Sequence, residues 1–223
     1  EFATKGNFND FGNLSSNRNE MSNVSNATRG VLSMGNPSAG NAIEYITMAS
    51  EGDSVDFGDR YNDQQIGSGT VQSPTRGVFI SGYNPSGVNN IMDYLTFSTL
   101  GNTADFGDAQ TAVRYPATSS NAIRGVQCGG GAPNTFTNAI EFITIATLGN
   151  AQDFGDSTTA GYGAGASSSR TRCVWGGDSS PGLTNTMDYV EIMVTGNAIN
   201  FGDLVTATRY VGSTSNGGGG LGG

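Results

Sequence analysis

The stretch Asp105-Phe106-Gly107-Asp108, inside the longer segment GNTADFGD at residues 101–108, decides how this chain is organised. Related copies occur at Asp10-Phe11-Gly12, Asp56-Phe57-Gly58-Asp59, Asp153-Phe154-Gly155-Asp156 and Asn200-Phe201-Gly202-Asp203. Successive phenylalanines lie 46 to 49 positions apart, which is the repeat length of propellers and related arrays. The sequence therefore predicts a repeat protein with a unit of about 48 residues.

Two apolar runs recur in every unit around this anchor. The first run opens on an arginine, and the second contains an acidic residue followed by an aromatic one. The arginines are Arg29, Arg76, Arg124 and Arg172, and the acidic-aromatic pairs are Glu44-Tyr45, Asp93-Tyr94, Glu141-Phe142 and Asp188-Tyr189. Both runs are short, rich in β-branched and aromatic residues, and separated by Gly, Pro, Asn and Ser, which is typical of strands and turns. No window shows an apolar period near 3.6, so we expect almost no helix.

The third unit predicts strands over residues 115–120, 124–128, 139–147 and 151–154. Four antiparallel strands in about 48 residues form the blade of a β-propeller. Read along the unit, the order resembles a kelch-type blade. The double glycines Gly129-Gly130 and Gly176-Gly177 stand where that family ends its second strand, and Tyr45, Tyr94 and Tyr189 match its third-strand tyrosine. Phenylalanine replaces the family's fourth-strand tryptophan, so the version is divergent.

The resemblance implies an all-β fold, a kelch-like β-propeller of about five four-stranded blades with the last one incomplete in this chain. We expect a single domain over residues 1–216, followed by a Gly-rich end at residues 217–223. The chain begins with an outer-strand element at residues 7–14 and ends with the start of a further unit at residues 208–216. Either the last blade is incomplete, or the sequence is a piece of a longer protein, which the start without Met and the final glycine run favour.

Composition narrows the function. The net charge is −9 with only 10 Lys and Arg, which argues against a nucleic-acid surface, because phosphate contacts need clustered basic residues. No segment approaches the apolar length of a membrane helix. Histidine is absent, the acidic residues are spread over the units, and Asp-Phe-Gly lacks the other kinase motifs, so we expect no enzyme and no cofactor. A surface of small polar residues with 13% charged residues is typical of virion, secreted or cell-surface proteins.

Several segments look like those of kelch-like structural proteins of marine bacteriophages, among them residues 149–156, 75–78, 44–47 and 138–144. This resemblance implies a non-enzymatic virion module, such as a tail, fibre or capsid-surface component, that binds another virion protein or a host surface glycan and can be oligomeric. The alternative is a secreted or cell-surface lectin-like propeller that binds carbohydrate.

Binding is expected in loops that differ between units, because the common scaffold cannot specialise. Residues 84–89, 131–136 and 178–183 join second and third strands in this way. The candidate ligand-binding residues are Tyr83, Asn84, Asn89, Asn134, Phe136, Trp175 and Asp178. For Trp175, a packed position between blades is the stronger interpretation.

Other repeated or paired residues have structural interpretations. The arginine that opens each first run suggests an ion pair or a carbonyl contact repeated in each blade, because repeated residues usually serve the repeated fold. Cys128 and Cys173 are expected to be two buried thiols, since they occupy non-equivalent positions.

The aspartates of the repeated motif allow two interpretations. Their hard carboxylate oxygens, a few residues apart, suit calcium. Tight turns, in which Asp accepts backbone N–H bonds and Gly supplies positive φ, explain the same residues and are favoured. The residues concerned are Asp56, Asp59, Asp105, Asp108, Asp153 and Asp156.

The turn interpretation predicts that millimolar calcium leaves the thermal unfolding midpoint unchanged. A calcium site would raise that midpoint, because a ligand that binds only the folded state stabilises it. Calorimetry with added calcium and with a chelator distinguishes the two interpretations, and magnesium serves as the control for ionic strength.

Overall fold

The computed structural model describes residues 9–33, 35–36, 40–61, 66–132, 135–179 and 181–215, and these residues form strands and turns without a helix. The first sheet contains β1 (Asn23–Ser25), β2 (Arg29–Ser33), β3 (Ala42–Thr47) and β4 (Val55–Asp59). The second contains β5 (Gly69–Gln72), β6 (Arg76–Asn84), β7 (Gly87–Thr96) and β8 (Ala104–Asp108). The third contains β9 (Ala117–Ser120), β10 (Arg124–Cys128), β13 (Ala139–Thr144) and β14 (Gln152–Asp156). The fourth contains β15 (Gly165–Ser168), β16 (Arg172–Gly176), β17 (Thr184–Glu191) and β18 (Ile199–Thr208).

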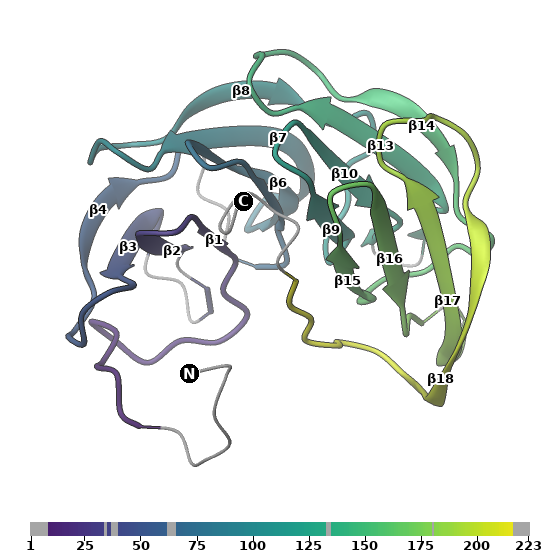
Figure 1. Cartoon of the computed structure of the whole chain (residues 1–223), viewed down its shortest axis with the longest axis horizontal. Coiled ribbons are helices and arrows are strands. Elements are labelled where there is room, and N and C mark those ends of the chain that lie inside the picture. Colours follow the sequence, from purple (N-terminus) through teal and green to yellow (C-terminus); the bar gives the residue numbers. More distant parts are fainter. Residues whose placement is uncertain are drawn as a thin grey trace.

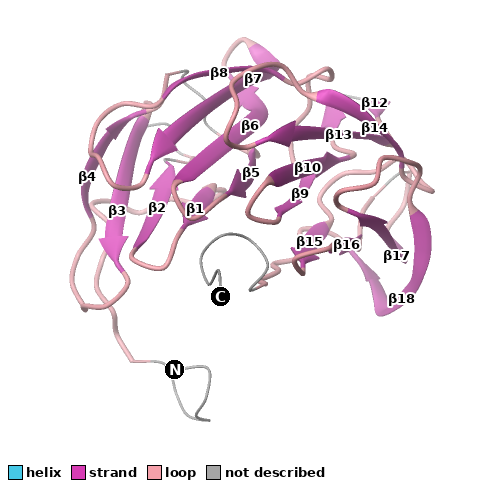
Figure 2. Ribbon diagram, turned by 45° about the horizontal axis from the view of Figure 1, so that its top comes forward, coloured by secondary structure: helices cyan, strands magenta, loops and turns pink. Residues whose placement is uncertain are grey.

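All four sheets are antiparallel and share one strand order, with β1, β5, β9 and β15 as the first strands. These first strands lie next to one another, and the sheets stand side by side in an arc around them (Figure 1). The turned view shows the same arc, with an opening between the first and fourth sheets (Figure 2). The expectation of an all-β chain of repeated four-stranded sheets is thus confirmed. No helix in the described ranges is long and apolar enough to cross a bilayer.

The core consists of three apolar layers, one between each pair of neighbouring sheets. The layer between the first and second sheets shows the pattern: Phe57 of one sheet packs with Phe79 and Phe97 of the next. Side chains of this size contribute about 1.5–3 kcal/mol each when fully buried. Because middle sheets are covered on both sides, their strands are apolar on both faces, as the sequence of β13 indicated.

The repeated Asp-Phe-Gly-Asp motif joins one sheet to the next. The phenylalanine is buried in three of its copies, Phe57, Phe106 and Phe154. In four copies, the backbone carbonyl of the phenylalanine accepts a hydrogen bond from a glycine in the turn after the third strand of the following sheet. The N···O distances are Gly52–Phe11 2.8 Å, Gly101–Phe57 2.8 Å, Gly149–Phe106 2.8 Å and Gly196–Phe154 2.7 Å. The glycine of the motif has positive φ and lies so close to this turn that a Cβ on Gly107 would sit 2.6 Å from the Gly149 oxygen. Glycine is therefore required by backbone contact as well as by conformation.

A second repeated contact explains the arginines. Each one lies over the third-strand aromatic ring of its own sheet, 4.4 Å from the ring centroid for Arg76 and Tyr94. Its guanidinium also donates to a carbonyl of the following sheet: Arg29 to Phe97, Arg76 to Ile145 at 2.8 Å and Arg124 to Ile192 at 3.0 Å. Arg172 pairs instead with Glu191 of its own sheet at 2.8 Å. The expected ion pair or carbonyl contact is confirmed in both forms.

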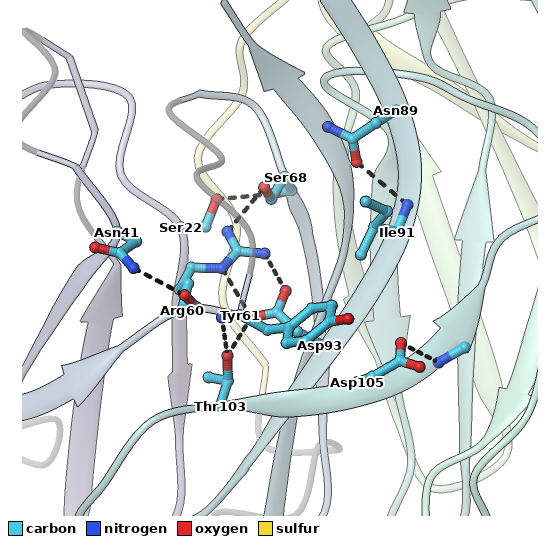
Figure 3. Close-up of polar contacts among 11 residues, drawn as sticks. Ser22, Asn41, Arg60, Tyr61, Ser68, Asn89, Ile91, Asp93, Thr103 and Asp105 are labelled. Carbon is cyan, nitrogen blue, oxygen red and sulfur yellow. Dashed lines mark hydrogen bonds and ion pairs between the residues drawn. The ribbon is translucent and has the colours of Figure 1, made fainter. Parts of the chain in front are cut away.

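Each third strand also carries a buried carboxylate that binds the chain segment leading into its own sheet. Asp93 is bound by the Nε of Arg60 at 3.1 Å and by the hydroxyl of Thr103 at 2.7 Å (Figure 3). Glu141 accepts a hydrogen bond from the backbone amide of Gln110 at 2.8 Å. The remaining members are Glu44, which binds Ser15 and Ser54, and Asp188, which binds Ser157 and Thr158. Buried carboxylates need such partners, so the acidic-aromatic pairs are structural elements.

Two of the three predicted loops between second and third strands contain paired strands. Residues 84–89 form the tight end of a long hairpin, because β6 and β7 stay paired up to Asn84 and Gly87. In the third sheet β11 (Gly131–Ala132) and β12 (Thr135–Phe136) make a small hairpin of their own.

Cys128 and Cys173 are free and buried, and burial raises the pKa of Cys173 to about 12.

Gly107→Ala is predicted to destabilise the protein by about 1–3 kcal/mol more than Gly202→Ala. The two glycines share the same backbone conformation, with φ of 137° and 142°. A Cβ on Gly107 overlaps the next sheet, whereas a Cβ on Gly202 meets only Met187, at 3.9 Å. Urea unfolding of both variants measures the difference. Equal losses would show that φ alone, and not the inter-sheet contact, requires glycine.

Candidate functional site

Five residues at equivalent places of the repeat adopt a left-handed backbone just before the first strands. They are Glu20 (φ 56°), Gly67 (φ 68°), Tyr115 (φ 51°), Gly163 (φ 78°) and Tyr210 (φ 56°). A positive φ is common for glycine and unfavourable for a bulky residue such as tyrosine. Strained residues of this kind cluster at functional sites. The start of the first strands is therefore the candidate site.

The backbone links four of these positions in sequence. The amide of Tyr115 donates to Gly67 at 2.7 Å, that of Gly163 donates to Tyr115 at 2.9 Å, and that of Tyr210 donates to Gly163 at 2.7 Å. Each tyrosine ring lies over the preceding glycine, so that a Cβ on Gly67 would meet the Tyr115 ring at 2.9 Å. The alternation of Gly and Tyr therefore makes room for two inward rings.

Four aromatic rings gather here into one cluster, which we call the aromatic mouth: Tyr115, Phe136, Tyr162 and Tyr210. Tyr115 and Tyr210 meet edge to face at 5.4 Å, and Tyr162 contacts both. Phe136 stacks on Tyr162 at 5.1 Å with nearly parallel planes. Tyr210 is 56% exposed and Phe136 is 40% exposed, so these two rings can meet a ligand.

Charged groups surround the rings. The Arg209 guanidinium donates to the Tyr162 hydroxyl at 2.7 Å, and Arg114 lies over the rings of Tyr83 and Tyr115. Glu20 accepts a hydrogen bond from the Tyr115 hydroxyl at 3.0 Å. Burial, together with the hydrogen bond to Glu20 and its negative charge, raises the pKa of Tyr115 well above its usual value.

A cavity of about 200 Å³ reaches the aromatic mouth at Tyr115 and Tyr210 and is lined by all five left-handed residues. A second cavity, about 310 Å³, lies between the first strands and is lined by small polar side chains such as Ser25, Thr70 and Thr118. Pro116, Ala164 and Val211 line both, so the two cavities are successive levels of one channel.

Two of the sequence-predicted binding residues lie at the aromatic mouth: Phe136 in its ring cluster and Tyr83 against Arg114. Trp175 is 5% exposed in the layer between the third and fourth sheets, which follows the packed interpretation. Asn84 accepts from Ser86 in the hairpin turn, and Asn89 accepts from Ile91. Asn134 lies outside the described residues.

Asp178 is half-buried and accepts the Thr184 hydroxyl at 2.6 Å. Burial raises the pKa of Asp178, and the Thr184 bond offsets part of this shift. The Asp178 carboxylate therefore stabilises the loop that contains it.

The aspartates of the repeated motif do not converge. Asp105 accepts from the Gly107 amide at 3.2 Å, which is the expected turn contact. Within the described ranges, no three His, Cys, Asp or Glu side chains lie close enough to hold a metal ion.

The repeat pattern of the sequence does not predict a binding role for six residues of this site: Tyr115, Tyr162, Tyr210, Arg114, Arg209 and Glu20. One signal was present, because Arg114-Tyr115 and Arg209-Tyr210 repeat a dipeptide at equivalent places of two units. It could not be interpreted without the backbone conformation, which places unlike residues at one structural position.

No family model matches the chain, and no curated protein matches it. Among solved structures, the fold is similar to that of YjhT, with a TM-score of 0.73 over 88% of this chain and 68% of that chain. The sequence identity is 10%, so the similarity concerns the fold alone.

Tyr115→Phe is predicted to make the free energy of unfolding decrease less steeply as pH rises into the alkaline range. A raised pKa favours the neutral phenol in the fold, so Tyr115 contributes stability that is present below about pH 10 and lost as pH rises further. The variant lacks this titration, and at neutral pH it loses only about 1 kcal/mol for the hydrogen bond to Glu20. Urea unfolding between neutral and alkaline pH measures the slope, with Tyr61→Phe at an exposed site as control. A slope identical to that of the unmodified protein contradicts the prediction.

Proposed function

We propose that the four sheets are blades of a kelch-like β-propeller with five blade positions. Five equivalent left-handed residues precede five inner segments, the last being residues 211–215. That segment lies beside β15, where Ser213 donates to the Ala166 carbonyl at 2.6 Å and Ser167 donates to the Thr214 carbonyl at 3.1 Å. At the other end, Phe11 meets the first sheet as Phe57 meets the second. Residues 9–14 and 211–215 thus occupy the outer and inner places of the fifth blade.

On this scaffold, the proposed function is non-enzymatic adhesion, with a glycan bound at the aromatic mouth. The observation that carries the proposal is the ring cluster itself, built from residues that differ between units on a backbone that does not. Sugars present C–H groups on one face and hydroxyls at their edges. Accessible rings such as Tyr210 and Phe136 suit the former. Polar groups at the rim, including Arg114 and Glu20, suit the latter.

The proposed setting is the surface of a virion, as a tail, fibre or capsid-surface component, and it rests on the sequence resemblance. The alternative setting is a secreted or cell-surface lectin. Both settings use the same site chemistry, so glycan binding is the property to test first.

A second proposed role, binding to another virion protein, is favoured by one observation. Phe201 and its neighbours on β18 are exposed, whereas the equivalent phenylalanines of the other sheets are buried.

The glycan proposal predicts binding on a glycan array, with affinity reduced at least about tenfold (about 1.4 kcal/mol) by Tyr210→Gly or by Phe136→Ala. Glycine suits position 210, because it occupies the same structural position at Gly67 and Gly163. The variant therefore removes a ring without straining the backbone. Tyr61→Ala, at an exposed site elsewhere, is the matched control. Absence of binding to any glycan, or equal binding by all variants, would refute the assignment.

A further inference from the structure

Two arginines stand at the aromatic mouth in places where the repeat does not require an arginine. Arg114 and Arg209 each come one residue before a left-handed tyrosine. In the other units the same place, just before the left-handed residue, holds Asn19, Ile66 and Tyr162. A position that accepts an amide, an aliphatic and an aromatic side chain is not one at which the fold depends on a guanidinium. The two arginines therefore belong to the site and not to the common scaffold.

The guanidinium of Arg114 is stacked on rings and carries no charge partner in the described ranges. Its central carbon lies 5.4 Å from the ring centroid of Tyr83 and 5.6 Å from that of Tyr115. Among the described residues, ion pairs form at Arg60 and Arg172, and the Arg114 guanidinium makes neither an ion pair nor a hydrogen bond. Rings cover the faces of a stacked guanidinium and leave the N–H donors at its edge available. Arg114 is thus positioned to donate to a bound group.

Arg209 adds a second positive charge on the other side of the rings. It is exposed, and its guanidinium lies 5.1 Å from the ring centroid of Tyr210. It donates to the Tyr162 hydroxyl at 2.7 Å, and this neutral group does not compensate its charge. The carboxylate of Glu20, also at the mouth, accepts from the Tyr115 hydroxyl at 3.0 Å. The mouth therefore concentrates positive charge on a chain whose net charge is −9.

Both positive charges act on one exposed ring. Burial and the hydrogen bond with Tyr162 raise the pKa of Tyr210, whereas the charges of Arg209 and Arg114 lower it. Tyr210 is 56% exposed and meets Tyr115 edge to face at 5.4 Å. A ligand that lies against the Tyr210 ring is consequently within reach of both guanidinium groups.

We propose that the glycan bound at the aromatic mouth is acidic, which rests on the proposed function and narrows its ligand class. A carboxylate or sulfate group of the glycan accepts hydrogen bonds from Arg114, and Arg209 provides a second positive contact. The sugar ring beside this group packs on Tyr210. Guanidinium groups bind oxyanions through two parallel N–H···O bonds, and a guanidinium already held on rings loses little side-chain freedom when it binds.

The test is a glycan array in which each acidic glycan has a neutral counterpart built from the same sugars. Oligogalacturonate against its methyl ester tests the carboxylate, and a sulfated galactose oligomer against its unsulfated form tests the sulfate. The intact protein is expected to bind the charged member of at least one pair at least about tenfold more tightly than the neutral member. The pair that shows this preference identifies the source of the negative charge.

Arginine variants locate the charge contact. Arg114→Gln and Arg209→Gln are each expected to weaken binding of the preferred acidic glycan at least about tenfold and to change binding of its neutral counterpart less than about twofold. Arg114→Lys keeps the charge without the planar fork and should recover part of the loss. Arg172→Gln is the matched control, because it removes an equal charge at the start of β16, whereas Tyr162 pairs with Ser179 beyond the end of that strand.

Three results would overturn the acidic ligand while leaving glycan binding at the mouth intact. One is a neutral glycan bound as tightly as its acidic counterpart, and another is normal binding of the acidic glycan by both glutamine variants. The third is an equal loss of affinity for charged and neutral members, which would show that the arginines only position the rings. Absence of binding to any glycan is a different outcome, since it refutes the proposed function itself.

Discussion

The hydrogen bond from a turn glycine to the phenylalanine carbonyl of the preceding sheet sets the geometry on which the rest of the structure depends. It recurs at 2.7–2.8 Å and fixes how closely two neighbouring sheets approach. The glycine contact beside it permits no side chain, so the spacing is set by backbone against backbone. The arginine contacts and buried carboxylates then act at distances that this joint has already determined. A fixed angle between neighbours, repeated along the chain, curves the sheets into an arc around their first strands.

Much of this could be predicted from sequence, because the joints use one residue type per position. Asp-Phe-Gly-Asp marks fourth strands, and the acidic-aromatic pairs mark third strands. The strands of the third unit were predicted to within a few residues at their ends. The small hairpin of β11 and β12 was not predicted, because short segments rich in Gly and Pro carry no apolar pattern. The predicted binding loops identify only part of the candidate site. Phe136 and Tyr83 lie at the aromatic mouth, whereas Trp175 is buried between two sheets.

The aromatic mouth escaped prediction for a physical reason. Two of its rings, Tyr115 and Tyr210, stand at the five left-handed positions, which share a conformation and not a residue type, since glutamate, glycine and tyrosine occupy them. Sequence comparison between units detects shared side chains, whereas this site is defined by shared φ and by rings that reach across the axis. Tyr115 and Tyr210 come from units that are not adjacent, and their contact at 5.4 Å depends on the curvature of the arc. The repeated backbone fixes where the side chains of the site lie, and the residues that vary between units determine which groups a ligand can contact.

The buried carboxylates have a consequence for how the chain reaches its folded state. Glu141 and Asp188 each connect a sheet to the one just before it, through residues about thirty positions away. Such contacts are moderately local, so two adjacent sheets can assemble before the others, and growth can then proceed in either direction. The second and third sheets have neighbours on both sides, whereas the first and fourth each have one complete neighbour. Amide hydrogens of the middle sheets should therefore exchange with solvent most slowly, with protection decreasing toward both ends of the arc.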